Sequence, residues 1–141
     1  MTTFRAVLPF PPSLNSYYSK KTVNKGARAF TSVYVNATGK KYRRDVGFCV
    51  KPIKLGGRLT VTVELFPPDR RIRDLDNYLK CLLDALTHGG VWHDDSQIDE
   101  LILKRRAITK GGGCVVSIRE LDTVEILSLQ THKYEDVQNG E

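Results

Sequence analysis

Cysteine is scarce in this chain, and long apolar runs are missing. The 141 residues include three cysteines, Cys49, Cys81 and Cys114, and none of them forms a C-x-x-C pair. This spacing supports neither a zinc site nor a disulfide framework, so we expect reduced thiols in a cytoplasmic protein. No apolar run reaches the roughly 18 residues that a membrane span needs. The first residues, MTTFRAVLPFPP, also lack the zones of a signal peptide, so we expect no membrane association.

Positive charge is unevenly distributed. The net charge is +6, but the last 21 residues contain five acidic residues and one basic residue. Residues 1–120 therefore contain 21 basic and 11 acidic residues, a net charge of +10. This balance suits a polyanionic partner such as nucleic acid, although many basic domains are simply soluble.

Hydrophobic periodicity predicts one α+β domain with a small mixed β-sheet and helices packed on one face. The clearest strand is 58–66, which we expect near the centre of the sheet, and the clearest helix is 75–87, whose leucines share one face. The other expected elements are a strand at 4–10, a mobile loop within 11–30, a helix at 36–51 and a hairpin of strands 96–108 and 114–121. Residues 1–121 would form the domain, and residues 122–141 an acidic C-terminal extension.

Two pairs of acidic residues flank the predicted helix. Asp74 and Asp76 precede or begin it, and Asp94 and Asp95 follow it. The helix is about 18–20 Å long, and residues 88–95 can span up to about 26 Å, so the chain can bring the two pairs together. Converging carboxylates repel one another unless a cation lies between them, and oxygen ligands favour Mg²⁺ or Mn²⁺. Lys80, one turn after Asp76, would add a cation for a phosphate group.

Simpler explanations exist for each of these residues. Asp74 or Asp76 would suit a helix cap or a surface salt bridge, and Asp94 and Asp95 would suit a turn. Lys80 forms an ordinary i, i+4 set with Asp76 and Asp84. Because Asp84 lies further along the helix, we expect it to tolerate replacement by asparagine better than Asp74 or Asp76.

Several motifs in order resemble the RusA family of Holliday-junction resolvases. They are LPFPPSLNSYY, PPDRRIRDLDNYLKCLLDAL, VWHDDSQI and TKGGG before the last strand, within residues 4–121. The resemblance implies a homodimer that binds four-way junction DNA and makes two symmetric cuts with Mg²⁺, for which Mn²⁺ can substitute. It also implies a bacterial or phage origin.

The resemblance assigns roles to individual residues. The metal-binding and catalytic aspartates of the family match Asp74, Asp76 and Asp95, with Asp94 as a possible further ligand, and the essential lysine matches Lys80. The residues that the resemblance assigns to DNA contact are Lys20, Lys21, Lys25, Arg28, Arg70, Arg71 and Arg73.

Two other functions compete with a metal-dependent endonuclease. One is a non-catalytic nucleic-acid-binding protein whose acidic residues only cap and brace the fold. Carboxylates among the basic residues argue against it, because they bring no benefit to a protein that only binds DNA. The other is a Mg²⁺-dependent phosphoryl-transfer enzyme that acts on small substrates. The sequence lacks a G-x-x-x-x-G-K-[ST] loop, which excludes a P-loop version of that enzyme.

Overall fold

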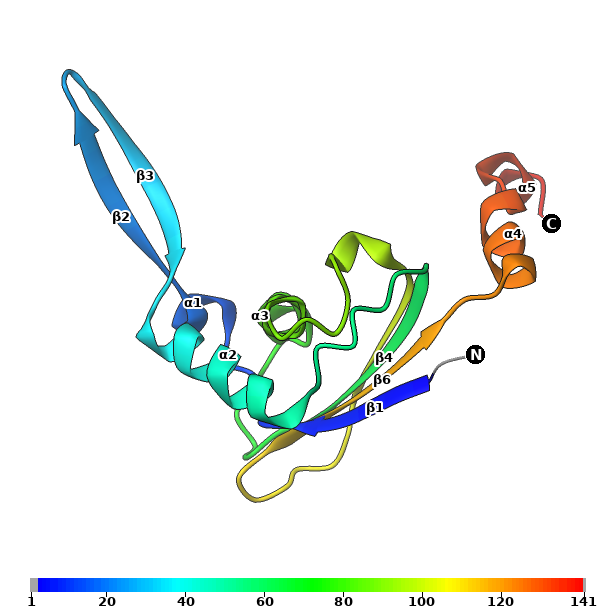
Figure 1. Cartoon of the computed structure of the whole chain (residues 1–141), viewed down its shortest axis with the longest axis horizontal. Helices are drawn as coiled ribbons and strands as arrows, with labels where there is room; N and C mark the ends of the chain where they lie inside the picture. Colours follow the sequence, from blue (N-terminus) through cyan, green and yellow to red (C-terminus); the bar gives the residue numbers. More distant parts are fainter. Residues whose placement is uncertain (1–2, 141) are drawn as a thin grey trace.

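A four-stranded sheet and two helices packed on it form the body of the molecule. The computed structural model describes residues 3–140. In chain order its elements are β1 (Thr3–Leu8), α1 (Leu14–Tyr17), β2 (Tyr18–Lys25), β3 (Arg28–Val35), α2 (Ala37–Cys49), β4 (Leu59–Phe66), α3 (Asp76–His88), the 3₁₀ turn η1 (Asp95–Gln97), β5 (Ile98–Arg105), β6 (Gly113–Glu120), α4 (Thr123–Thr131) and α5 (Tyr134–Gln138). The strand order is β1-β6-β4-β5, and Figure 1 shows α2 and α3 over one face of this sheet. The predicted α+β class with a mixed sheet is confirmed.

Strand β4 lies in the interior of the sheet, as predicted. It pairs with β5 in parallel and with β6 in antiparallel orientation. Its side chains Leu59, Val61, Val63 and Leu65 are buried, and the leucines of α3 belong to or pack against the same core. Because β4, α3 and β5 form a parallel crossover, the loop that enters α3 lies beyond the end of β4.

The predicted hairpin of the last two strands is wrong. Strands β5 and β6 do not pair with each other, because β4 lies between them. The connection 106–112 carries the chain past the end of β4, so that β5 and β6 pair with opposite edges of β4. The fully buried side chains of β4 need a neighbouring strand on each of these edges. Alternation along a strand predicts which face is buried but does not predict which strand is its neighbour.

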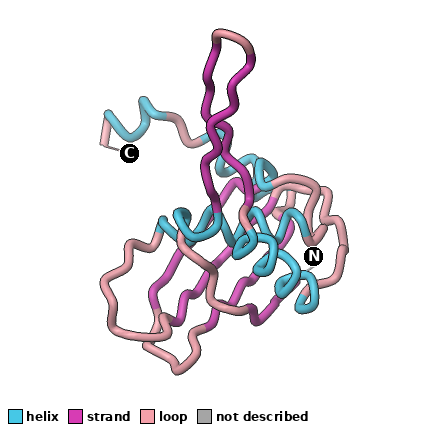
Figure 2. The backbone as a smooth tube through the Cα atoms, turned by 90° about the vertical axis from the view of Figure 1, so that its left-hand side faces the viewer, coloured by secondary structure: helices cyan, strands magenta, loops and turns pink. Residues whose placement is uncertain are grey.

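The basic segment predicted as a mobile loop is a regular β-hairpin. Strands β2 and β3 pair antiparallel from Tyr18 and Val35 to Lys25 and Arg28. Gly26 is the first of the two turn residues and has a φ of 62°, the conformation that a type II′ turn requires at that position. We call residues 18–35 the arm, and Figures 1 and 2 show that it projects away from the body.

A polar clamp holds the base of the arm. The hydroxyl of the fully buried Tyr17 donates a short hydrogen bond to the Asp84 carboxylate. The Arg43 guanidinium lies 2.8 Å from the same carboxylate and donates to the Tyr17 hydroxyl at 2.9 Å. Burial and the hydrogen bond to Asp84 raise the pKa of Tyr17 above its usual range. The clamp therefore ties α1, α2 and α3 together directly beneath the arm.

We expect Asp84→Ala to destabilise the fold. The substitution removes the carboxylate to which both the Arg43 guanidinium and the Tyr17 hydroxyl donate, a loss of about 1–3 kcal/mol in the free energy of unfolding. Urea denaturation followed by circular dichroism measures it. Asp45→Ala is the matched control, because among residues 3–140 Asp45 forms only an i, i+4 pair with Lys41 on the surface of α2, a pair type that contributes about 0.3–0.5 kcal/mol. Equal stability of the two variants would contradict the role of the clamp.

The C-terminal segment forms two short helices at the end of the sheet remote from the arm (Figure 1). Helix α4 begins with a capping box between Asp122 and Glu125. Arg119 of β6 pairs with Glu125 at 2.6 Å, and this hydrogen-bonded pair lowers the pKa of Glu125 to about 2. Across residues 3–140, no helix combines the length and the apolar character needed to cross a membrane.

Candidate active site and nucleic-acid interface

Asp74 and Asp76 lie where the chain enters α3. Asp76 is the first residue of the helix, and the backbone carbonyl of Asp74 accepts a hydrogen bond from the N–H of Asn77 at 3.2 Å. Both residues are exposed, and within the described part of the chain neither carboxylate has a hydrogen-bond or ion-pair partner. The N-cap residue is Leu75, which provides no side-chain cap. The capping and salt-bridge alternatives therefore do not account for these two carboxylates.

In the second acidic pair, hydrogen bonds hold the Asp94 carboxylate, whereas the Asp95 carboxylate forms none within residues 3–140. The Asp94 carboxylate accepts a hydrogen bond from the N–H of Ser96 at 3.1 Å, and the contact with Ser96 lowers the pKa of Asp94. The Gln97 side chain closes the capping box by accepting from the N–H of Asp94, and it also donates to the carbonyl of Leu55 at 2.8 Å. The exposed Asp95 carboxylate has no such partner among residues 3–140. The D-D-x-Q motif thus uses Asp94 and Gln97 to hold the loop and leaves Asp95 free.

Lys80 lines a groove at the base of the arm. Its ammonium lies 6.0 Å from the centre of the Tyr18 ring, at the start of β2. The groove has a volume of about 320 Å³ and is lined by Leu14, Asn15, Tyr18, Lys20, Val33 and Lys80. A predicted catalytic lysine and a predicted DNA-contacting lysine therefore face the same space.

Among the residues that the structure describes, the lining of this groove contains no acidic residue, and the predicted aspartates do not form a closed cluster. Within residues 3–140, no three His, Cys, Asp or Glu side chains are arranged as a set that could hold a metal ion. Asp76 and Lys80 occupy successive turns on one side of α3. Burial raises the pKa of Tyr18, and the nearby negative charges of Asp84 and Asp95 raise it further. Asp95 is thus within electrostatic reach of the ring that Lys80 faces.

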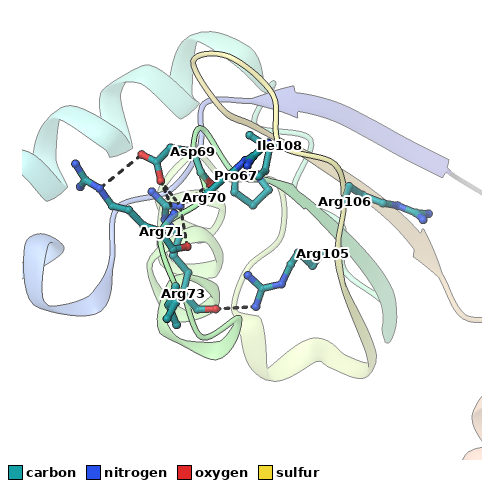
Figure 3. Close-up of a pocket in the computed structure, with 9 residues that line it drawn as sticks. Pro67, Asp69, Arg70, Arg71, Arg73, Arg105, Arg106 and Ile108 are labelled. Carbon is teal, nitrogen blue, oxygen red and sulfur yellow. Dashed lines mark hydrogen bonds and ion pairs between the residues drawn. The ribbon is translucent and has the colours of Figure 1, made fainter.

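A second groove, lined by arginines, adjoins the start of α3 (Figure 3). Its volume is about 380 Å³, and it is lined by Pro67, Asp69, Arg70, Arg71, Ile72, Arg73, Arg105, Arg106 and Ile108. Among the predicted DNA contacts in this groove, Arg70 and Arg71 are exposed. Arg73 is different, because its side chain is 10% exposed, pairs with Asp69 at 2.8 Å and lies over the Phe10 ring. Its contacts are those of a residue that braces the loop before Asp74.

The family model for the endodeoxyribonuclease RusA matches residues 9–119. The chain belongs to the RusA family. It is 38% identical over 128 residues to the crossover junction endodeoxyribonuclease rusA of Enterobacteria phage HK97, with 88% of this chain and all of the relative covered. It is also 38% identical to the Escherichia coli K12 RusA protein and 37% identical to that of Enterobacteria phage 82, each over 125 residues and 86% of this chain.

The RusA match encloses both grooves and ends in β6. It contains the arm, the start of α3, η1 and both ends of the arginine groove. Helices α4 and α5 follow the last matched residue, and the phage HK97 relative is covered in full without the whole of this chain. The family relationship therefore concerns the part of the molecule that contains all the predicted site residues.

Two arginines of this chain line the arginine groove but were not among the residues predicted from the sequence. Arg105 and Arg106 enter the arginine groove from the end of β5, far along the chain from Arg70 and Arg71. Arg105 donates to the carbonyl of Arg73 at 2.6 Å, and Arg106 pairs with Glu64 at 2.6 Å. The run Lys104-Arg105-Arg106 was a visible signal, but only the parallel pairing of β5 with β4 brings it beside the first arginine cluster.

Proposed function

We propose that this protein is a Holliday-junction resolvase, a structure-selective endonuclease that makes paired cuts in four-way DNA junctions. One observation carries the proposal: Asp76, whose carboxylate has no partner among residues 3–140, lies one helical turn before Lys80, which shares a groove with Lys20 of the basic arm. An acidic and a basic side chain thus lie one turn apart beside the basic arm, which supports a role in binding phosphate. The names of the phage and bacterial relatives, crossover junction endodeoxyribonucleases, indicate the kind of DNA involved.

Asp74, Asp76 and Asp95 would hold a divalent cation. The donor set fits Mg²⁺, or Mn²⁺ in its place, because it consists of exposed carboxylates whose oxygens are not used elsewhere among residues 3–140. Asp94 is the weaker candidate, since its carboxylate caps η1. When bound, such an ion activates water and neutralises charge on a phosphodiester.

The protein's own cations would position the DNA. Lys80 would bind a non-bridging oxygen of the phosphate to be cut and stabilise the negative charge that develops there. Arg70, Arg71, Arg105 and Arg106 would hold phosphates on the other side of the acidic residues, where the arginine groove lies. Arg73 would act indirectly by fixing the loop that carries Asp74.

Three further features belong to the proposal. Paired symmetric cuts need two active centres, so we infer a homodimer whose two sites face one junction.

The nuclease domain would comprise residues 1–121, with residues 122–141 as an extension outside it. The end of the family match at residue 119 supports this boundary. The bacterial and phage sources of the relatives suit action in a bacterial cytoplasm.

Incubation with a labelled four-way junction tests the proposed function. We expect paired, symmetric nicks with Mg²⁺ or Mn²⁺, no cutting in excess chelator, and little cutting of linear duplex of the same sequence. Binding without cutting under all conditions would favour a non-catalytic DNA-binding protein. Equal cutting of linear duplex would remove the junction selectivity.

We expect the triple substitution of Lys20, Lys21 and Lys25 by alanine to weaken junction binding and to flatten its salt dependence. If each lysine neutralises one phosphate, the slope of log K against log salt concentration falls by about 2–3. Titrations at several salt concentrations measure it.

The control for this triple variant is the substitution of Lys51, Lys54 and Lys133 by alanine. It removes the same charge from positions outside the arm and should leave the slope nearly unchanged. Equal slopes for the arm variant and the wild type would rule out phosphate contacts by the arm.

A further inference from the structure

The arm carries more than positive charge. Residues 18–35 contain the bases Lys20, Lys21, Lys25 and Arg28 and no acidic residue. The arm also exposes the large apolar side chains Phe30, Val33 and Tyr34. An isolated two-stranded ribbon is marginally stable in water, so exposed aromatic side chains on it are costly unless a partner covers them.

The two faces of the arm differ in what they contact. Side chains alternate between faces along a strand, and Lys20 is paired with Val33 on the face that lines the Lys80 groove. The opposite face carries Phe30, which is paired with Val23 and is 48% exposed. Lys21, Lys25 and Arg28 lie on that face on either side of Phe30 along the ribbon. An exposed aromatic ring is thus flanked by cations near the tip of the arm.

Nucleic acid is the partner that this combination fits. Cations bind the phosphate backbone, and an aromatic ring stacks on a nucleobase with little regard to its identity. In a continuous duplex the bases already stack on one another, so an inserted ring must separate them at a cost. At a branch point that stacking is interrupted, and the cost is lower.

The spacing along the arm places the ring close to the reacting centre. The Val23–Phe30 pair lies three positions along the ribbon from the Lys20–Val33 pair, a distance of about 10 Å. One DNA strand advances about 3.4 Å per nucleotide, so this distance corresponds to about three nucleotides. Phe30 therefore lies about three nucleotides further along the arm than the Lys80 groove, on the opposite face of the ribbon.

We propose that Phe30 is a wedge that inserts at the branch point of a DNA junction and stacks on a base there, while the lysines and arginine of the arm hold the adjacent phosphates. The wedge makes branched DNA a better ligand than linear duplex. This inference rests on the proposed function, because it concerns how that same site chooses its substrate.

Fluorescence of 2-aminopurine tests the wedge. The probe is placed in the base pairs next to the branch point of a four-way junction, and binding is measured in chelator so that the DNA stays intact. We expect wild-type protein to raise the fluorescence severalfold, because stacking between bases is lost, and to leave a linear duplex unchanged. Phe30→Ala should lose most of this rise and lower the preference for junction over duplex about tenfold, since one stacked base accounts for such a factor. Phe30→Trp should restore both.

Phe48→Ala is the matched control, because Phe48 is 83% exposed but lies on α2 outside the arm. It should behave as wild type, and circular dichroism checks that all variants are folded. If wild-type protein cuts junctions but Phe30→Ala keeps its fluorescence change and junction preference, the wedge is wrong and the proposed function stands. If the wild-type protein neither prefers nor cuts junctions, the proposed function is wrong, and the wedge, which rests on it, is wrong as well. If Phe30→Ala changes only the sedimentation of the free protein, the ring meets a second copy of the chain and the wedge is overturned.

Discussion

Replacing Asp76 by asparagine is expected to lower junction cutting by at least about a hundredfold while junction binding survives. The amide keeps the size and much of the polarity of the side chain but removes the charge that a divalent cation needs. Loss of one preorganised electrostatic contact at a reacting centre typically costs about 10²–10³ in rate. Binding should persist or tighten, because one source of repulsion toward phosphate is gone. Single-turnover cutting and equilibrium binding of the same labelled junction measure the two effects.

The choice of control follows from the structure. Asp84 is unsuitable, although its distance from Asp74 and Asp76 along α3 had made it an expected tolerant position. Its carboxylate holds Arg43 and Tyr17 beneath the arm, so its replacement changes the fold as well as the charge. Asp45→Asn removes the same charge from the surface of α2, where the carboxylate pairs with Lys41 and with no other side chain in the described part of the chain. Wild-type cutting by Asp76→Asn, or undiminished cutting in excess chelator, would refute the metal-site mechanism.

Elements with one buried face were predictable from the sequence. The leucines of α3 repeat at helical spacing, and β4 alternates apolar side chains, so each pattern specifies the face that meets the core. Where an element buries one face only, the order of apolar and polar residues along the chain predicts which face packs against the core.

The arm was not predictable in this way, because both of its faces are largely exposed. Strands β2 and β3 show no apolar and polar alternation, and their lysines and tyrosines resemble those of a solvated loop. Only the β-branched residues and the glycine turn indicated a hairpin, and neither signal is strong alone. The distinction between Asp94 and Asp95 was equally hidden. It depends on the capping box between Asp94 and Gln97 and on the hydrogen bond that Gln97 donates to the carbonyl of Leu55, which is remote in sequence.

Lys80→Ala is the other substitution expected to abolish cutting, with a loss of at least about a hundredfold for want of positive charge at the phosphate. Its position supports this role: it follows Asp76 by one turn and faces the Tyr18 ring in the groove that Lys20 also lines. Binding should change little, because one phosphate contact among many alters the salt slope by about 0.9 at most. Lys80→Arg should recover part of the rate, since it restores charge but places a larger planar group in the groove.

The combination of Asp76→Asn with Lys80→Ala separates a shared catalytic role from two independent losses. Residues that act as a unit on one transition state show strongly non-additive effects, so the double variant should be little slower than the slower single variant. Lys51→Ala removes a lysine charge outside both grooves and should cut like the wild type. If Lys80→Ala weakens binding and leaves the single-turnover rate at saturating protein unchanged, Lys80 contributes only to DNA affinity. The stabilisation of charge at the cut phosphate must then come from another cation, and the nearest described alternatives are Lys20 on the arm and the arginines on the other side of Asp74.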